Sequence, residues 1–176
     1  MVSIREVGPR DGFQNEPDVI ATDDKVRLVE MLAHTGVRRL EVTSFVRADV
    51  IPQLADGAEV LRRADIPDDV AVSVLIPNER GLEHALEVRD RFGEVNLFLS
   101  ASETHNRKNV NRSVEESLAG LERVIARARD EAGLRCEGVI STSFGCPYEG
   151  YVPVERVLAI AERLAAAGCA EVAFGD

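Results

Sequence analysis

Two oppositely charged side chains stand side by side near the start of the chain. Arg10 and Asp11 follow a short apolar run that is broken at Gly8-Pro9, and Gly12 comes directly after them. Gly and Pro mark the end of a strand, so we expect this pair on the loop past the strand's carboxyl end. In barrels of alternating strands and helices, that rim carries the chemistry. A solvated ion pair in an exposed turn is the alternative interpretation.

More polar side chains fall where the later predicted strands end. They are Glu41, Thr43 and Ser44 in the second strand, Asn78 after the third, Ser100, Ser102 and Glu103 after the fourth, Ser141 and Ser143 in the fifth, and Asp176 after the sixth. In a barrel these groups would converge on one mouth. A cluster of Arg, Asp and Glu suits metal-assisted chemistry on an anionic substrate.

Glu41 is the most telling member of this set, because it interrupts an apolar strand. Strict alternation along a strand would place Glu41 and Thr43 on one face. A carboxylate in the middle of a strand is rarely buried without a partner, so we expect Arg10 or another cation nearby. A solvent-facing position at the edge of the sheet is the alternative.

The elements that must position these residues alternate between two periodic patterns. After the opening strand, helical periodicity with matching start and stop signals covers 22–36, 56–64, 78–93, 113–133 and 153–168, and strand-like runs cover 37–45, 70–76, 95–99, 137–143 and 170–174. The stretch 100–112 is expected to be a long polar loop. Repeated βα units predict a parallel sheet with right-handed crossovers, as an open doubly wound sheet or as a barrel. A GxGxxG fingerprint is absent after the first strand, which counts against a dinucleotide fold.

Length and composition narrow the class of protein. The chain has 176 residues, of which 45% are apolar and 30% charged, so we expect one globular domain covering 1–176. A formal charge of −10 argues against nucleic acid as a partner. No apolar stretch is long enough to span a bilayer, and the start lacks the form of a signal peptide. Three cysteines without a CxxC pair predict neither a disulfide framework nor a zinc site, and favour a cytoplasmic location.

Five motifs in register resemble one known family. They are Glu6 to Glu16 around Gly-Pro-Arg-Asp-Gly, Leu40 to Val46, Ala101-Ser102-Glu103 with Lys108 to Asn111, Gly145 to Gly150 (Gly-Cys-Pro-Tyr-Glu-Gly), and Phe174-Gly175-Asp176. Together they resemble the hydroxymethylglutaryl-CoA lyase family of the DRE-TIM metallolyases, over the whole chain. The Gly-Pro-Arg-Asp-Gly and Cys-Pro-Tyr-Glu-Gly forms favour this branch over the related aldolases and synthases.

The resemblance implies a fold, a reaction and roles for five residues. The fold would be a TIM-type (β/α)8 barrel, here truncated to about six strands and five helices. The reaction would cleave 3-hydroxy-3-methylglutaryl-CoA, an acyl-CoA substrate, to acetyl-CoA and acetoacetate with Mg²⁺ or Mn²⁺, as in leucine degradation and ketone-body metabolism. Asp11 would be a metal ligand, Arg10, Glu41 and Asp176 would be catalytic, and Ser143 would bind substrate together with Arg10.

The chain also departs from the family pattern. The family's His-x-His pair, an asparagine ligand and a catalytic cysteine all lie beyond the sixth strand, and these positions have no counterpart here. His34 and His84 fall on predicted helices, and His105 alone is placed to approach the site. We therefore expect an incomplete barrel that is weakly active or inactive by itself.

Two alternatives stay open at this point. One is an aldolase or acyl-transfer synthase of the same superfamily. The other is a non-catalytic open-barrel module that assembles through its edge strands, for example as a homo-oligomer.

Overall fold

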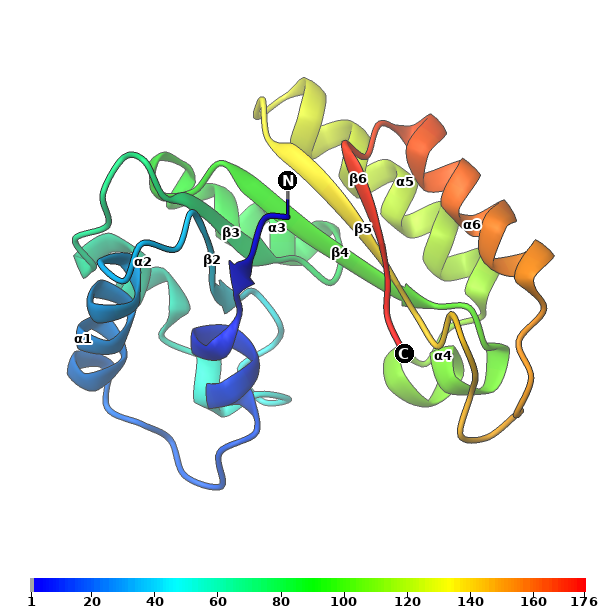
Figure 1. Ribbon diagram of the computed structural model, residues 1–176, viewed down its shortest axis with the longest axis horizontal. Coiled ribbons are helices and arrows are strands. Elements are labelled where there is room, and N and C mark those ends of the chain that lie inside the picture. Colours follow the sequence, from blue (N-terminus) through cyan, green and yellow to red (C-terminus); the bar gives the residue numbers. More distant parts are fainter. Residues whose placement is uncertain (1) are drawn as a thin grey trace. The chain divides into compact units, whose positions relative to one another are not determined.

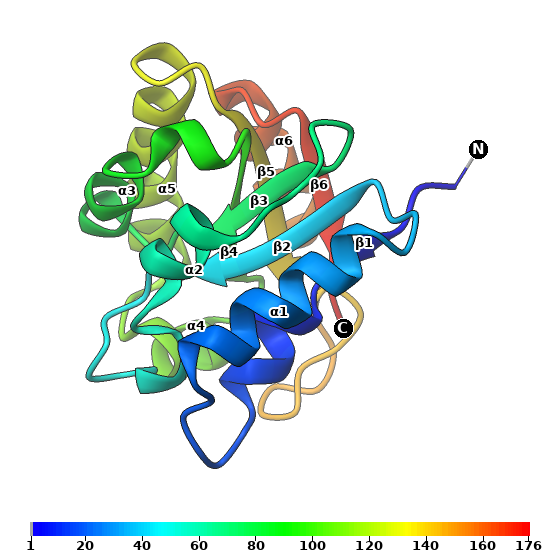
Figure 2. The same cartoon turned by 90° about the vertical axis from the view of Figure 1, so that its left-hand side faces the viewer.

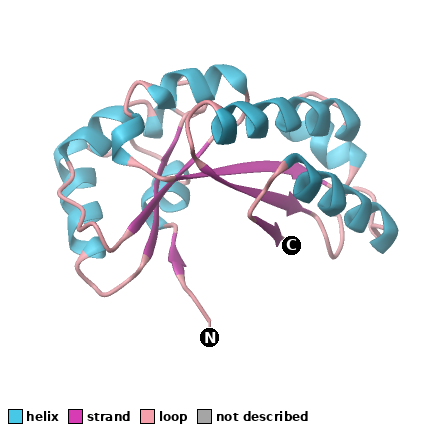
Figure 3. Ribbon diagram, turned by 90° about the horizontal axis from the view of Figure 1, so that it is seen from above, coloured by secondary structure: helices cyan, strands magenta, loops and turns pink. Residues whose placement is uncertain are grey.

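The computed structural model describes residues 2–176, which divide into two compact units. Unit 1 ends at Glu94 and unit 2 begins at Val95. Each unit contains parallel strands flanked by helices (Figures 1 and 3). The expected α/β alternation is therefore present in both units. A single domain over 1–176 stays a prediction.

Unit 1 opens with the shortest strand and the most unusual helical turn of the chain. Its elements are β1 (Arg5–Glu6), the π-helical turn η1 (Gly8–Gly12), α1 (Thr22–Ala33), β2 (Arg39–Ser44), the 3₁₀ turn η2 (Pro52–Leu54), α2 (Gly57–Arg63), β3 (Ala71–Leu75), α3 (Glu79–Leu86) and the 3₁₀ turn η3 (Arg89–Arg91). The strands run parallel in the order β1-β2-β3. Helix α2 contacts β2, and α1 packs against α2 (Figure 2).

The two faces of β2 and β3 differ in polarity. Leu40 pairs in register with Val72, and both are buried apolar residues. On the opposite face Arg39 pairs with Ala71 and Glu41 with Ser73. Neighbouring residues of a parallel sheet share a face, so one side of the sheet is apolar and packs against helices, while the other carries charged and hydroxyl groups.

Unit 2 continues the same alternation. Its elements are β4 (Glu94–Ser100, in this unit from Val95), α4 (Glu103–Val110), α5 (Val114–Asp130), β5 (Arg135–Ser141), α6 (Val154–Ala167) and β6 (Glu171–Phe174). The strand order is β4-β5-β6, with β6 parallel to β5. Helices α5 and α6 lie side by side (Figure 1). Close packing of α6 on β5 depends on Gly138, because a Cβ there would come within 2.8 Å of Leu164 Cδ1.

Several sequence-based boundaries are confirmed by capping contacts. Ser113 and Glu116 form the capping box expected for α5, with the Glu116 backbone N–H donating to Ser113 Oγ at 3.1 Å. Asn78 caps α3 by accepting from the backbone N–H of Gly81. At α1, however, the N-cap is Ala21, and the Thr22 hydroxyl donates instead to Asp56.

The expected loop over 100–112 is wrong, because it contains helix α4. Ser102 caps the helix by accepting from the His105 backbone N–H, and Asn111 ends it in the left-handed conformation. Asn106 is buried and donates to the carbonyls of Arg112 and Ser113. Polar side-chain contacts thus hold α4, and it shows no apolar stripe. Residues 2–176 therefore contain six α-helices, one more than expected.

No helix within residues 2–176 combines the length and the apolar character that crossing a bilayer would require.

The contact between α2 and β2 gives a test of this packing. A Cβ on Gly57 would overlap Thr43 Oγ1 and lie 2.9 Å from Thr43 Cγ2. Gly57→Ala should therefore destabilise the protein by about 1–3 kcal/mol from overpacking, despite a helix-propensity gain of about 0.5–1 kcal/mol. Chemical denaturation measures the change.

Two controls accompany this variant. Gly93→Ala should cost little, because nothing lies within 4 Å of a Cβ there. Adding Thr43→Ala to Gly57→Ala should recover part of the loss. Equal stability of Gly57→Ala and the wild type would contradict the packing described for α2.

Candidate active site

Arg10 and Glu41 form the central ion pair of unit 1. Arg10 Nε donates to Glu41 Oε1, and Arg10 Nη1 donates to Asp11 Oδ1 at 2.7 Å. The Glu41 side chain is only 3% exposed, whereas Arg10 is 19% exposed. The cation expected next to Glu41 is therefore Arg10, and the alternative of a solvent-facing Glu41 is wrong. Among residues 2–176, Arg10 Nη2 donates to no other group, so its N–H bonds are open to a ligand.

The turn η1 sets the position of Arg10. Pro9 is buried at its start, and the backbone N–H groups of Arg10 and Asp11 both donate to the Val7 carbonyl, at 3.0 and 2.8 Å. Turns of π type are uncommon and occur frequently at functional sites. The sequence predicted a loop here, and the structure has a hydrogen-bonded turn that fixes where the guanidinium begins.

Asp11 is the predicted metal ligand, and its carboxylate lies at the surface. The side chain is 52% exposed, and its Oδ1 accepts from Arg10. Within residues 2–176 no group of three or more His, Cys, Asp or Glu side chains is arranged to hold a metal ion. A divalent cation requires several ligands, so Asp11 and its neighbours do not form a metal site by themselves. The role of Asp11 stays a prediction.

A β-bulge in β2 changes which hydroxyl accompanies Glu41. Glu41 pairs with Ser73, but the next pairs are Thr43 with Val74 and Ser44 with Leu75, so Val42 is an extra residue. Bulges shift the alternation of a strand by one residue. The expectation that Glu41 and Thr43 share a face is therefore wrong: Thr43 packs against Gly57 of α2, and Ser44 shares the face of Glu41.

Ser143 and Asp176 lie in unit 2, where the ends of β5 and β6 are joined. Ser143 is buried, and its Oγ donates to the Ile140 carbonyl at 2.7 Å. The Ser143 backbone N–H donates to the Gly175 carbonyl at 2.9 Å, next to Asp176. Strand β5 ends at Ser141, before the expected boundary, because Thr142 has a positive φ of 59°. Asp176 is exposed.

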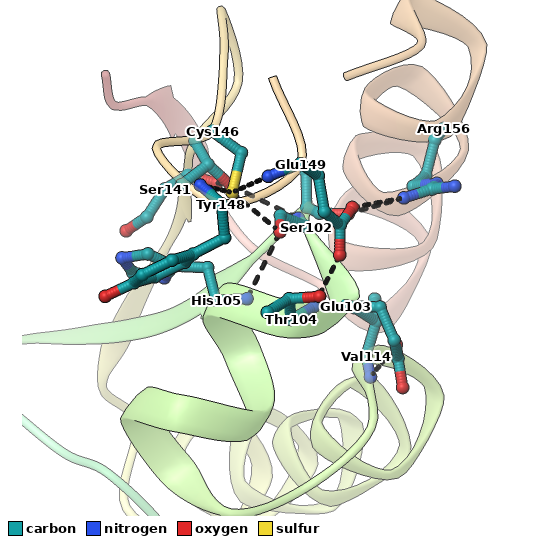
Figure 4. A network of polar contacts seen from close by, with 12 residues as sticks. Ser102, Glu103, Thr104, His105, Val114, Ser141, Cys146, Tyr148, Glu149 and Arg156 are labelled. Atoms are coloured by element: carbon teal, nitrogen blue, oxygen red, sulfur yellow. Dashed lines mark hydrogen bonds and ion pairs between the residues drawn. The ribbon is translucent and has the colours of Figure 1, made fainter. Parts of the chain in front are cut away.

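Unit 2 also contains a polar network that the sequence analysis did not single out (Figure 4). The Cys146 thiol lies 2.9 Å from Ser102 Oγ, and Glu149 Oε1 accepts from the Thr104 backbone N–H at 2.6 Å. Arg156 lies 3.7 Å from the other Glu149 oxygen. These contacts tie the loop after β5 to the first turn of α4. In the sequence, the loop after β5 is marked by the Gly-Cys-Pro-Tyr-Glu-Gly motif. The motif alone does not indicate which residues the loop contacts.

The environment of Cys146 differs from that of the other two cysteines. Burial acts to raise the pKa of Cys146, but hydrogen bonds from Ser102 and from the backbone N–H groups of Glu149 and Tyr148 bring it below its usual value. Burial instead raises the pKa of Cys136 to about 11 and that of Cys169 to about 12. All three thiols are free, as expected from their spacing.

His105 lies in α4 and faces the same loop. Its Nδ1 is 2.6 Å from Ser100 Oγ, and its ring centroid is 6.0 Å from that of Tyr148. Lys108 Nζ lies 4.8 Å from the Tyr148 ring centroid, in a cation–π contact. His105 therefore contacts protein groups of unit 2.

Comparison with known proteins assigns the family. The model of the family described as HMGL-like matches residues 1–176. The chain belongs to this family. This HMGL-like chain is 47% identical over 175 residues to hydroxymethylglutaryl-CoA lyase YngG of Bacillus subtilis, a match that covers 99% of the chain and 58% of the relative. It thus spans little more than half the length of that protein.

Solved structures confirm the fold class. The crystal structure of the Bacillus subtilis HMG-CoA lyase matches with a TM-score of 0.95 at 47% identity, covering 99% of this chain and 58% of that one. An HMG-CoA lyase from Acinetobacter baumannii, solved in complex with coenzyme A and 3-methylmalate, matches with a TM-score of 0.92 at 34% identity, covering 99% and 56%. The α/β TIM-type class, truncated to six strands, is confirmed for the HMGL-like chain.

The hydrogen bonds around Cys146 predict the order in which the thiols ionise. Because its pKa is lowered, Cys146 should become a thiolate at lower pH than Cys136 and Cys169. Thiolates react with iodoacetamide and thiols do not. Alkylation followed by peptide mass spectrometry, from about pH 6 to about pH 11, should bring the Cys146 rate to a plateau within this range, while the rates of Cys136 and Cys169 are still rising at its upper end.

The unfolded protein is the control for this measurement, since its three cysteines should share one midpoint. A native Cys146 midpoint equal to that of Cys136 would contradict the proposed hydrogen bonding.

Proposed function

We propose that this chain is the part of a carbon–carbon lyase that binds and polarises an acyl-CoA thioester, and that the enzyme cleaves 3-hydroxy-3-methylglutaryl-CoA to acetyl-CoA and acetoacetate. The observation that carries the proposal is Arg10, which is fixed by Glu41 while its Nη2 remains open. The names of the similar proteins support the same reaction. The cytoplasmic location stays a prediction.

The reaction needs stabilisation of negative charge on one oxygen atom. When the tertiary hydroxyl loses its proton, its C–O bond becomes the ketone of acetoacetate and the adjacent carbon–carbon bond breaks. The electron pair moves to the acetyl-CoA fragment, and its thioester oxygen becomes an enolate oxygen. Protonation of the enolate carbon then gives acetyl-CoA and balances the proton removed from the hydroxyl. A preorganised donor aimed at that oxygen stabilises the transition state more than the ground state. We assign this role to the open Nη2 of Arg10.

Glu41 and Asp176 are given different roles because their surroundings differ. Glu41 is buried against Arg10 Nε, so it orients the guanidinium. Asp176 is exposed at the end of β6, and we assign it to proton removal from the substrate hydroxyl. Ser143 donates its hydroxyl proton to Ile140, so in substrate binding it would act as an acceptor.

The proposed substrate class rests on the structure of one relative. The Acinetobacter baumannii structure contains coenzyme A and 3-methylmalate. We infer that the present protein also takes an acyl-CoA with an oxygenated acyl group. Mg²⁺ or Mn²⁺ is proposed as the cofactor, with Asp11 as one ligand. The described residues do not complete a metal site by themselves.

A coupled assay for acetoacetate tests the reaction directly. The protein that carries this chain is incubated with 3-hydroxy-3-methylglutaryl-CoA and Mg²⁺ or Mn²⁺, and acetoacetate formation is followed. The 176-residue chain is assayed alongside, and we expect it to be weakly active or inactive by itself. Turnover of α-keto acids with acetyl-CoA, without acetoacetate formation, would favour a synthase and overturn the lyase assignment.

Replacing Arg10 tests its role in the transition state. Arg10→Lys keeps the charge but loses the planar fork that lets Nε and Nη2 act together. We expect kcat to fall by about 100-fold to 1,000-fold, with a much smaller change in KM. Steady-state kinetics measure both constants.

Arg63→Lys is the matched control, because Arg63 is a surface arginine of unit 1 paired with Glu59 and Asp23. It should leave kcat unchanged. A large rise in KM with unchanged kcat in Arg10→Lys would show that Arg10 binds substrate without stabilising the enolate.

A further inference from the structure

Two adjacent hydroxyl groups of β2 are buried without a hydrogen-bond partner. Thr43 Oγ1 and Ser44 Oγ both have no donor or acceptor within reach in the part of the chain that the structure describes. Each residue is 2% exposed. Burying a hydroxyl without a partner costs about 1–3 kcal/mol, so such a group needs either a structural explanation or a ligand.

The bulge at Val42 separates the two hydroxyls onto opposite faces of the sheet. Thr43 lies on the apolar face, where its side chain packs against Gly57 of α2. Both the hydroxyl and the methyl group of Thr43 face Gly57, so helix α2 covers this side chain. Ser44 lies on the polar face with Glu41, at the last position of the strand. Packing against a helix therefore accounts for Thr43 and leaves Ser44 unexplained.

The position of Ser44 relates it to Arg10. Strand β2 runs parallel to β1, and η1 with Arg10 directly follows β1. The carboxyl ends of parallel strands meet at one edge of a sheet, so Ser44 ends its strand at the edge that carries the Arg10–Glu41 pair. All of these elements belong to unit 1.

We propose that Ser44 is a specificity-determining residue whose Oγ hydrogen-bonds a second oxygen of the acyl group, other than the thioester oxygen held by Arg10. This proposal rests on the proposed function and narrows it to acyl-CoA substrates with an oxygenated acyl chain. Because two carboxylates already share the guanidinium of Arg10, a neutral hydroxyl donor at this edge adds polarity without further charge. An acyl chain with that oxygen would satisfy a hydroxyl that is otherwise buried and unpaired, and so gain a hydrogen bond that a chain without the oxygen cannot make.

Three acyl-CoA probes identify the oxygen. 3-Methylglutaryl-CoA has the terminal carboxylate but no hydroxyl, and 3-hydroxy-3-methylbutyryl-CoA has the hydroxyl but no terminal carboxylate. Isovaleryl-CoA has neither and is the reference. Calorimetric titration of the protein that carries this chain gives Kd for each probe without requiring turnover.

Ser44→Ala is compared with Thr43→Val, the matched control that removes the other unpartnered hydroxyl. We expect Ser44→Ala to weaken one of the two oxygenated probes by about threefold to tenfold relative to isovaleryl-CoA. Weakening of 3-methylglutaryl-CoA identifies the carboxylate, and weakening of 3-hydroxy-3-methylbutyryl-CoA identifies the hydroxyl. Thr43→Val should leave all three ratios unchanged. Both variants should melt at or above the wild-type temperature, because each removes an unpaired buried group.

The outcomes separate failure of this proposal from failure of the proposed function. Unchanged probe ratios in Ser44→Ala, or a melting temperature several degrees lower, would overturn the assignment of Ser44 and leave the lyase reaction standing. Absence of binding for every acyl-CoA would overturn the proposed function and this proposal with it. Selective weakening in Ser44→Ala without acetoacetate formation in the coupled assay would keep Ser44 as an acyl-oxygen contact and reject the lyase reaction.

Discussion

The ion pair between Arg10 and Glu41 is the interaction on which the candidate site depends. A carboxylate that is 3% exposed loses most of its hydration, and several kcal/mol would be needed to bury it alone. The guanidinium of Arg10 offsets that cost. The Arg10 side chain loses conformational freedom when the ion pair forms. The contact forms only if the turn η1 fixes the position of Arg10 after β1 and if β2 holds Glu41 in the matching register. Backbone geometry in two elements is thereby coupled to a single contact between side chains.

The polarity of the sheet follows from the same requirement. Helix α2 covers the apolar face of β2, so charged groups are confined to the other face. A strand with strict alternation would place the residue two positions after Glu41 on that polar face. The bulge inserts Val42, which is 1% exposed, and advances the polar position to Ser44. Because of this one extra residue, the hydroxyl on the same face as the ion pair belongs to Ser44 and not to Thr43.

The sequence predicted the elements whose signals are local. The alternation of helix-like and strand-like patterns located the strands, and capping residues such as Asn78 and Ser113 located helix starts. A carboxylate inside an apolar strand indicated a cation near Glu41, with a solvent-facing position as the alternative. The bulge was not predictable, because it arises from register against β3 and leaves no mark in the order of residues. Helix α4 was missed because polar contacts such as those of Asn106 stabilise it. The pairing of Cys146 with Ser102 joins residues far apart in the chain, and no periodic pattern encodes it.

The hydrogen bond between Cys146 and Ser102 must change direction with the charge on the sulfur. In the neutral form the Cys146 thiol donates to Ser102 Oγ at 2.9 Å. A thiolate has no hydrogen to donate, so after ionisation the Ser102 hydroxyl must donate to the sulfur instead. The orientation of this one hydroxyl group therefore follows the ionisation state of Cys146. Because Ser102 also caps α4 through the His105 backbone N–H, the charge on the loop after β5 is coupled to the N-cap of that helix.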